Sequence, residues 1–127
     1  MTFQISDTMN LTSLIEIIKK HPHYDRAGMI LCHNGVVRST SRDGRRVSGL
    51  SITVDYEQLL EVIEKHKKRP GIIEILFKIA ENKKLSVGDD IMLLVVAGDI
   101  RKNVIKVLSE AIDDIKSTVT KKTEYFL

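Results

Sequence analysis

The chain has 127 residues, of which 43% are hydrophobic and 29% are charged. A chain of this length buries roughly two-thirds of its unfolded surface, so we expect residues 1–127 to form a single domain. Twenty basic and seventeen acidic residues give a net charge of +3, and the two signs are interspersed. With three Tyr, three Phe and no Trp, the composition argues against a nucleic-acid-binding surface, which combines a basic stripe with stacking aromatic residues.

Cysteine content and hydropathy point to a cytoplasmic protein. Cys32 is the only cysteine, so no internal disulfide can form and a reducing compartment is expected. The first ten residues lack the basic-then-apolar pattern of a signal peptide. No apolar run is long enough to span a bilayer, so we expect no membrane partner.

The N-terminal part of the chain predicts one strand and one helix. We expect a short strand over residues 3–5 and a helix over residues 11–20. Asn10 or Ser13 is the expected helix cap, and Pro22 ends the helix.

Residues 27–38 and 47–55 are rich in β-branched and other apolar side chains and are predicted to be paired strands. The polar, basic loop over residues 39–46 joins them, and its Asp43-Gly44 pair is typical of a tight turn. We therefore expect a β-hairpin here.

The remaining elements complete an α+β pattern. Residues 55–69 form an amphipathic helix with Asp55 as its cap, and residues 71–80 and 90–98 form buried strands. Residues 98–116 carry apolar side chains at three- and four-residue intervals, which predicts a third helix. With residues 120–127 as an irregular tail, the order is β-α-β-β-α-β-β-α. We expect three helices on a mostly antiparallel or mixed sheet.

Two basic residues flank the apolar stripe of the third predicted helix. Arg101 and Lys116 are fifteen residues apart, which corresponds to about 22 Å along a helix axis. One small ligand cannot touch both within one chain.

Arg38 ends the second predicted strand, and its guanidinium could donate a planar pair of hydrogen bonds to phosphate or carboxylate oxygens. A solvated arginine at a strand end is the alternative. Lys116, Lys121 and Lys122 form a second candidate cluster, because neighbouring lysines lower each other's pKa and so become available for proton transfer. Here the alternative is a lysine-rich helix end favoured by the helix dipole.

Four side chains raise the question of a zinc site: His21, His23, Cys32 and His33. Their spacing does not match paired zinc ligands, and adjacent strand residues point to opposite faces. We therefore expect no metal site, and we expect Cys32 to be a small buried side chain.

The ordered motifs of the chain resemble the large, catalytic subunit of molybdopterin synthase from about residue 21 to residue 126. In chain order, these motifs are Gly35-Val36-Val37-Arg38, Gly88-Asp89, Arg101, Asp113 to Lys116, and Lys122 with Glu124. The resemblance implies an α/β-hammerhead type of fold and a sulfur transfer. Family members take sulfur from the thiocarboxylated C-terminus of a small ubiquitin-like subunit and place it on cyclic pyranopterin monophosphate, which yields molybdopterin.

The same resemblance assigns roles to five residues. Arg38 and Arg101 are expected to bind the anionic substrate and carrier tail, and Lys116 and Lys122 are expected to be catalytic through proton transfer or charge neutralisation. Lys121 is assigned to substrate binding and is the alternative to Lys122, because the alignment needs a gap there. The family acts as a homodimer of large subunits with a small subunit at each end, and its pocket uses both large subunits. It implies no cofactor in this subunit, because molybdenum is inserted later in the pathway.

The chain departs from the family pattern at several positions. Ile100 replaces a histidine in the motif before the third helix, His33 replaces an aromatic residue before Gly35, and the tryptophan near the C-terminus is missing. These departures leave two hypotheses open. The first is an active sulfurtransferase, and the alternative is a catalytically impaired paralogue that binds a ubiquitin-like carrier as a dimeric scaffold or regulator. A generic basic α+β interaction domain would explain the charge but not the ordered motifs.

Overall fold

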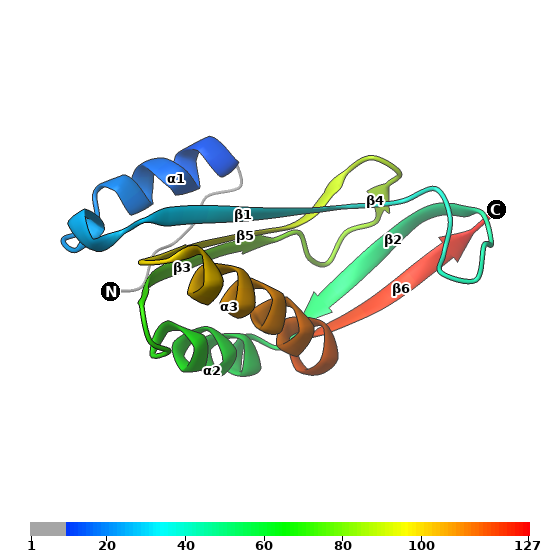
Figure 1. Cartoon of the computed structure of the whole chain (residues 1–127). Helices are drawn as coiled ribbons and strands as arrows, with labels where there is room; N and C mark the ends of the chain where they lie inside the picture. Colours follow the sequence, from blue (N-terminus) through cyan, green and yellow to red (C-terminus); the bar gives the residue numbers. More distant parts are fainter. Residues whose placement is uncertain (1–9) are drawn as a thin grey trace.

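The computed structural model describes residues 10–127, so the strand expected over residues 3–5 lies outside the described part. The described residues form three α-helices and two three-stranded antiparallel sheets (Figure 1). This confirms the α+β fold expected from the sequence.

Two of the three described α-helices begin after a polar cap residue. Helix α1 spans Leu11–Lys19, and the side chain of Asn10, not that of Ser13, is its cap, accepting a hydrogen bond from the Ser13 amide at 3.0 Å. Helix α2 spans Tyr56–Lys67, with Asp55 as its cap, as predicted. Helix α3 spans Arg101–Asp114 and continues into a π-helical turn, η2, over Ile115–Val119. A short 3-10 turn, η1, spans Tyr24–Arg26.

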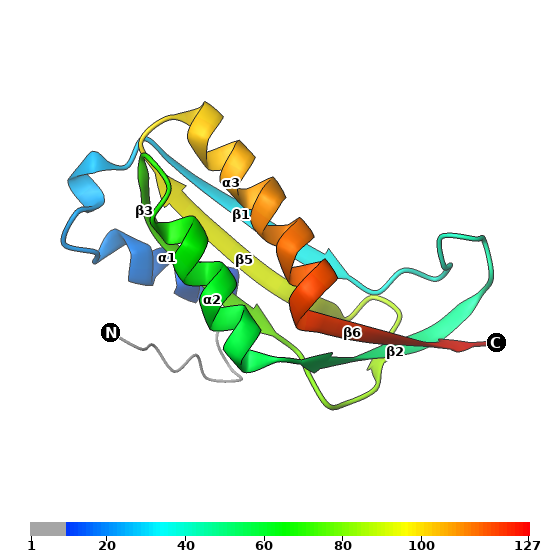
Figure 2. The same ribbon diagram turned by 90° about the horizontal axis from the view of Figure 1, so that it is seen from below.

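The larger sheet contains β1 (Met29–Val36), β5 (Asp90–Gly98) and β3 (Ile72–Ile79), in that order. Helix α1 covers one face of the sheet, and α2 and α3 lie side by side on the other (Figures 1 and 2). The central strand β5 is therefore buried from both sides: Leu94, Val95, Val96 and Ala97 have no exposed surface. Burial on both faces explains its continuous apolar sequence.

The smaller sheet contains β4 (Leu85–Ser86), β2 (Val47–Val54) and β6 (Thr120–Phe126), in that order. Two sequence predictions were wrong here. The segments over residues 27–38 and 47–55 do not form a hairpin, because β1 pairs with β5 and β2 pairs with β4 and β6. The tail is not irregular, because it forms β6. Its side chains are mostly polar and exposed, so the sequence lacks the apolar pattern from which a strand is predicted.

A small apolar cluster joins the two sheets: Val37, Leu50, Ile52 and Leu85. This cluster holds the end of β1 against β2, so the chain leaving β1 comes close to the smaller sheet. Among residues 10–127, no helix has both the length and the apolar content needed to cross a membrane.

Candidate active site

Three of the five predicted site residues follow one another along η2 and β6, whereas Arg38 and Arg101 lie in other parts of the fold. Arg38 follows β1, Lys116 lies in η2, and Lys121 and Lys122 lie in β6, directly after η2. Arg101 is the first residue of α3 and lies at the opposite end of that helix. All five side chains are exposed.

The two lysines of β6 face opposite sides of the smaller sheet. Lys122 is paired with Ile52, and Lys121 is paired with Thr53. Residues directly opposite in an antiparallel pair share a face, so Lys122 lies on the face whose apolar residues hold the two sheets together. Lys121 lies on the outer face. Lys122 also forms an ion pair with Glu124 at 3.9 Å.

Lys116 acts electrostatically on His33 of β1. Burial lowers the pKa of His33 below its ordinary value, and the positive charge of Lys116 lowers it further. Leu31, two residues earlier on β1, packs in the core beneath α3, and alternation along the strand puts His33 on the same face. The end of α3 and the end of β1 therefore meet at this histidine.

The His33 imidazole lies over the backbone of Gly35. A Cβ atom at residue 35 would come within 3.2 Å of His33 Nε2, which is closer than ordinary contact. Among residues 10–127, Nε2 of His33 has no hydrogen-bond partner although it is buried. An orphaned buried nitrogen is costly in free energy and is a feature that calls for a functional explanation.

Arg38 directly follows Val37, which fixes this part of the chain against the smaller sheet. Val37 is buried, packs in the cluster with Leu50 and Ile52, and donates its amide to the carbonyl of Asp89 at 3.0 Å. The basic loop that follows is turned back toward β6, and the guanidinium carbon of Arg45 lies 3.6 Å from the centre of the Phe126 ring. The Asp43-Gly44 turn is present, with Gly44 at a φ of 86°.

At the other end of α3, Ile100 is the cap residue of the helix and its side chain is 55% exposed. The Ile100 side chain forms no hydrogen bond that caps the helix. Instead, the Asp99 carboxylate accepts hydrogen bonds from the Ile100 backbone amide at 2.7 Å and from the Asn103 side-chain amide at 3.0 Å. The bond from Asn103, followed by that from Ile100, lowers the pKa of Asp99. Arg101 is the first residue of this helix and lies about 22 Å along the axis from Lys116.

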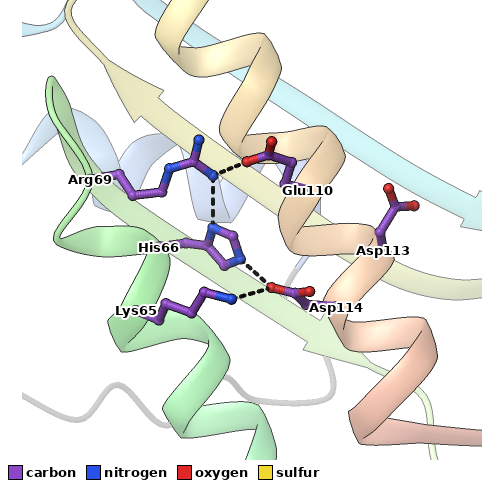
Figure 3. Close-up of a pocket in the computed structure, with 6 residues that line it drawn as sticks. All are labelled: Lys65, His66, Arg69, Glu110, Asp113 and Asp114. Atoms are coloured by element: carbon purple, nitrogen blue, oxygen red, sulfur yellow. Dashed lines mark hydrogen bonds and ion pairs between the residues drawn. The ribbon is translucent and has the colours of Figure 1, made fainter.

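A groove of about 480 Å³ between α2 and α3 was not predicted from the sequence (Figure 3). Five of its lining residues form a connected set that we call the α2–α3 bridge: Lys65, His66, Arg69, Glu110 and Asp114. The sequence offered no signal for this network, because nothing in it shows that residues some 40 to 50 positions apart lie side by side.

Metal-ligating side chains do not gather in the part of the chain that the structure describes. No three His, Cys, Asp or Glu side chains within residues 10–127 are placed to hold a metal ion. Cys32 is partly buried against α1, and burial raises the pKa of its thiol. The reactive thiolate is therefore disfavoured at neutral pH.

Comparison with known proteins places the chain in a family. A model of the MoaE protein family matches residues 5–118. The chain belongs to the MoaE family. A search of curated proteins found no significant match.

Solved structures with a similar fold come from several bacteria. Molybdopterin cofactor biosynthesis protein E from Burkholderia multivorans aligns with a TM-score of 0.73 and 18% identity, over 100% of this chain and 93% of that one. Molybdopterin synthase from Staphylococcus aureus aligns with a TM-score of 0.69 and 22% identity, over 81% of this chain and 77% of that one. A complex of subunits 1 and 2 of the molybdopterin-converting factor from Helicobacter pylori aligns with a TM-score of 0.68 and 18% identity, over 93% of this chain and 84% of that one. These TM-scores establish a shared fold.

Proposed function

We propose that this chain is the catalytic subunit of a molybdopterin synthase. It transfers sulfur from a thiocarboxylated small subunit to cyclic pyranopterin monophosphate in the cytoplasm. Membership of the MoaE family supports this assignment. The observation that supports it at the level of residues is the placement of Lys116, whose charge acts on the partly buried His33, directly before β6, in which Lys122 lies on the core-facing side.

The chemistry of sulfur transfer suits these cationic side chains. The substrate carries a phosphate and the carrier tail carries a negative thiocarboxylate, and both need positive partners. Arg38 supplies a guanidinium that can bind two oxygens at once. Lys116 and Lys122 neutralise charge as sulfur attacks and the pterin-linked ring opens, and they supply a proton to the leaving oxygen.

Lys122 is the better candidate than Lys121 for the catalytic role in β6. Lys122 shares a sheet face with Ile52, and that face is turned toward the core that joins the two sheets. Lys121 lies on the opposite face, where it can meet only a partner that approaches from outside. We therefore assign Lys121 to binding and Lys122 to catalysis.

Arg101 requires a second copy of the chain. Because it lies about 22 Å along the axis from Lys116, one pocket can use both only if the two residues come from different subunits. Two features support a homodimer. In the described residues β1 has a strand neighbour on one side only, and Ile100 and Ile105 expose apolar surface on α3. Two-fold symmetry would give two equal pockets.

A small sulfur-carrier subunit is the second proposed partner. The Helicobacter pylori relative was solved as a complex of two different subunits. One carrier would bind at each pocket of the homodimer, with its C-terminal tail reaching Lys116 and Lys122.

Reconstitution tests the proposed function. The purified chain is mixed with a thiocarboxylated carrier and cyclic pyranopterin monophosphate, and the dithiolene product is measured. We expect product formation that depends on both components. If no product forms at saturating carrier although the carrier binds, the proposed sulfur-transfer activity is excluded.

Exposed Ile100 favours the second candidate function, a catalytically impaired paralogue that binds the carrier as a dimeric scaffold or regulator. Family members that resemble this chain have a histidine at that position, and the isoleucine side chain cannot exchange protons. Under this alternative the chain binds the carrier without turnover, and the substitution Ile100→His restores product formation.

A further inference from the structure

The α2–α3 bridge links the middle of the molecule to the turn that carries Lys116. His66 Nε2 lies 2.7 Å from Asp114 Oδ2, and Lys65 Nζ lies 3.0 Å from the same oxygen. Arg69 contacts His66 Nδ1 at 3.3 Å and also pairs with Glu110. Figure 3 shows these contacts as one line of side chains running between the two helices.

The bridge is not arranged as a ligand site, because its charged groups are paired with one another. The His66 side chain is only 2% exposed. Arginine has donors but no acceptor, so His66 Nδ1 must accept from Arg69, and the remaining nitrogen donates Nε2–H to Asp114. The imidazole is thus oriented from both sides, with its donor fixed on the Asp114 carboxylate.

Asp114 also organises the turn that follows it. It is the last residue of α3, and its carbonyl accepts hydrogen bonds from the hydroxyl of Thr118 at 2.7 Å and from that of Ser117 at 3.3 Å. The ends of the π-helical turn are fixed in the core, since Ile115 is fully buried and Val119 is 3% exposed. Such turns are rare and are frequent at functional sites.

Lys116 is the second residue of this turn and is exposed. Its direction therefore depends on where Asp114 is held, and Asp114 is held by α2. We propose that His66, acting through Asp114, is a positioning residue that aims Lys116 into the active site. The inference rests on the proposed catalytic role of Lys116, but the position of Lys116 can be measured without any turnover.

Kinetic experiments separate positioning from general stability. The variant His66→Leu keeps bulk but removes the donor to Asp114, and we expect kcat to fall by about tenfold to a hundredfold with little change in KM. The variant His66→Gln can still donate to Asp114 and should recover kcat to within a few-fold. Leu14→Ala, in α1 on the other face of the sheet, is the matched control. It destabilises the protein without touching the bridge, so its kcat should equal that of the wild type at a temperature where all variants are folded.

A second readout needs no activity. Nuclear magnetic resonance reports the titration of His33, whose pKa is lowered by the charge of Lys116. We expect the pKa of His33 to rise in both His66→Leu and Lys116→Gln, and to stay unchanged in Leu14→Ala. If sulfur transfer is absent from the wild type, the proposed function fails while this shift still supports positioning. An unchanged His33 titration in His66→Leu, or a kcat loss equal to that of Leu14→Ala, would overturn the inference.

Discussion

Lys122 of β6 lies directly opposite Ile52 of β2, whereas its neighbour Lys121 lies opposite Thr53. Because side chains alternate along a strand, these neighbouring lysines lie on opposite faces of the sheet: Lys122 on the face that meets the core and Lys121 on the outer face. This difference decides which of the two is expected to act in catalysis.

The two lysines therefore have different expected effects on sulfur transfer. Lys122→Ala should lower kcat by about a hundredfold or more, because a positioned proton-transfer group contributes at least that much. Lys121→Ala, its matched control in the next residue, should change kcat by less than about threefold and act on carrier affinity. Steady-state measurement of dithiolene formation separates the two, and equal effects on kcat would remove the assignment based on the sheet face.

Removal of the Lys116 charge should change the titration of His33. Burial and the charge of Lys116 both lower the pKa of His33. In Lys116→Gln only burial remains, so the pKa should move upward toward the ordinary value of 6.5 without reaching it. Proton chemical shifts of the imidazole followed from pH 4 to pH 8 report this directly. Lys102→Gln, at the start of α3, is a control that should leave the titration unchanged.

Gly71 should tolerate alanine much less well than Gly44. Both have positive φ, 80° and 86°. At residue 71 a Cβ atom would lie 2.1 Å from Asp99 Oδ1, whereas at residue 44 nothing lies within 4 Å. We expect Gly44→Ala to cost about 1 kcal/mol of unfolding free energy through backbone strain alone. Gly71→Ala should cost about 3 kcal/mol, because a steric clash is added. Urea unfolding measures both, and equal losses would mean that Asp99 moves aside freely.

The stability contributed by Asp114 should disappear in acid. Hydrogen bonds from His66 and then Lys65 lower the pKa of Asp114 below its ordinary value of 3.8. A carboxylate with a depressed folded-state pKa stabilises the fold above the unfolded pKa, and this contribution is lost as the pH falls through the folded pKa. The unfolding free energies of the wild type and Asp114→Asn should therefore differ at pH 7, and the difference should begin to shrink below about pH 4 and be lost only below the folded-state pKa of Asp114. A difference that is the same at pH 7 and pH 3 would show that the carboxylate charge is not involved.

The helices could be predicted from the sequence because their determinants are local. Asn10 and Asp55 are caps next to periodic apolar residues, and Pro22 and Pro70 follow the helix ends. The pairing of strands is decided by contacts between distant residues. Residues 27–38 and 47–55 are close in sequence and joined by a tight turn, yet β1 pairs along its whole length with the apolar strand β5, and β2 pairs with the polar strand β6.

The site was predictable in part for the same reason. The motifs that resemble the molybdopterin synthase large subunit named Lys116 and Lys122, which the fold places in successive elements, η2 and β6, and Arg38, which lies after β1. The partly buried environment of His33 and the contact between His66 and Asp114 form only when α3 packs on β1 and against α2. No local pattern in the sequence predicts such contacts.

The most direct measurement concerns the claim that one pocket takes Arg101 from one chain and Lys116 from another. Arg101→Ala and Lys116→Ala are each expected to inactivate the homodimer, because each removes a residue from both pockets. When the two variants are co-expressed, random pairing gives mixed dimers in half of the population. Each of these has one pocket with both residues intact, so about a quarter of the wild-type activity should return. A mixture no more active than either variant alone would contradict the shared pocket.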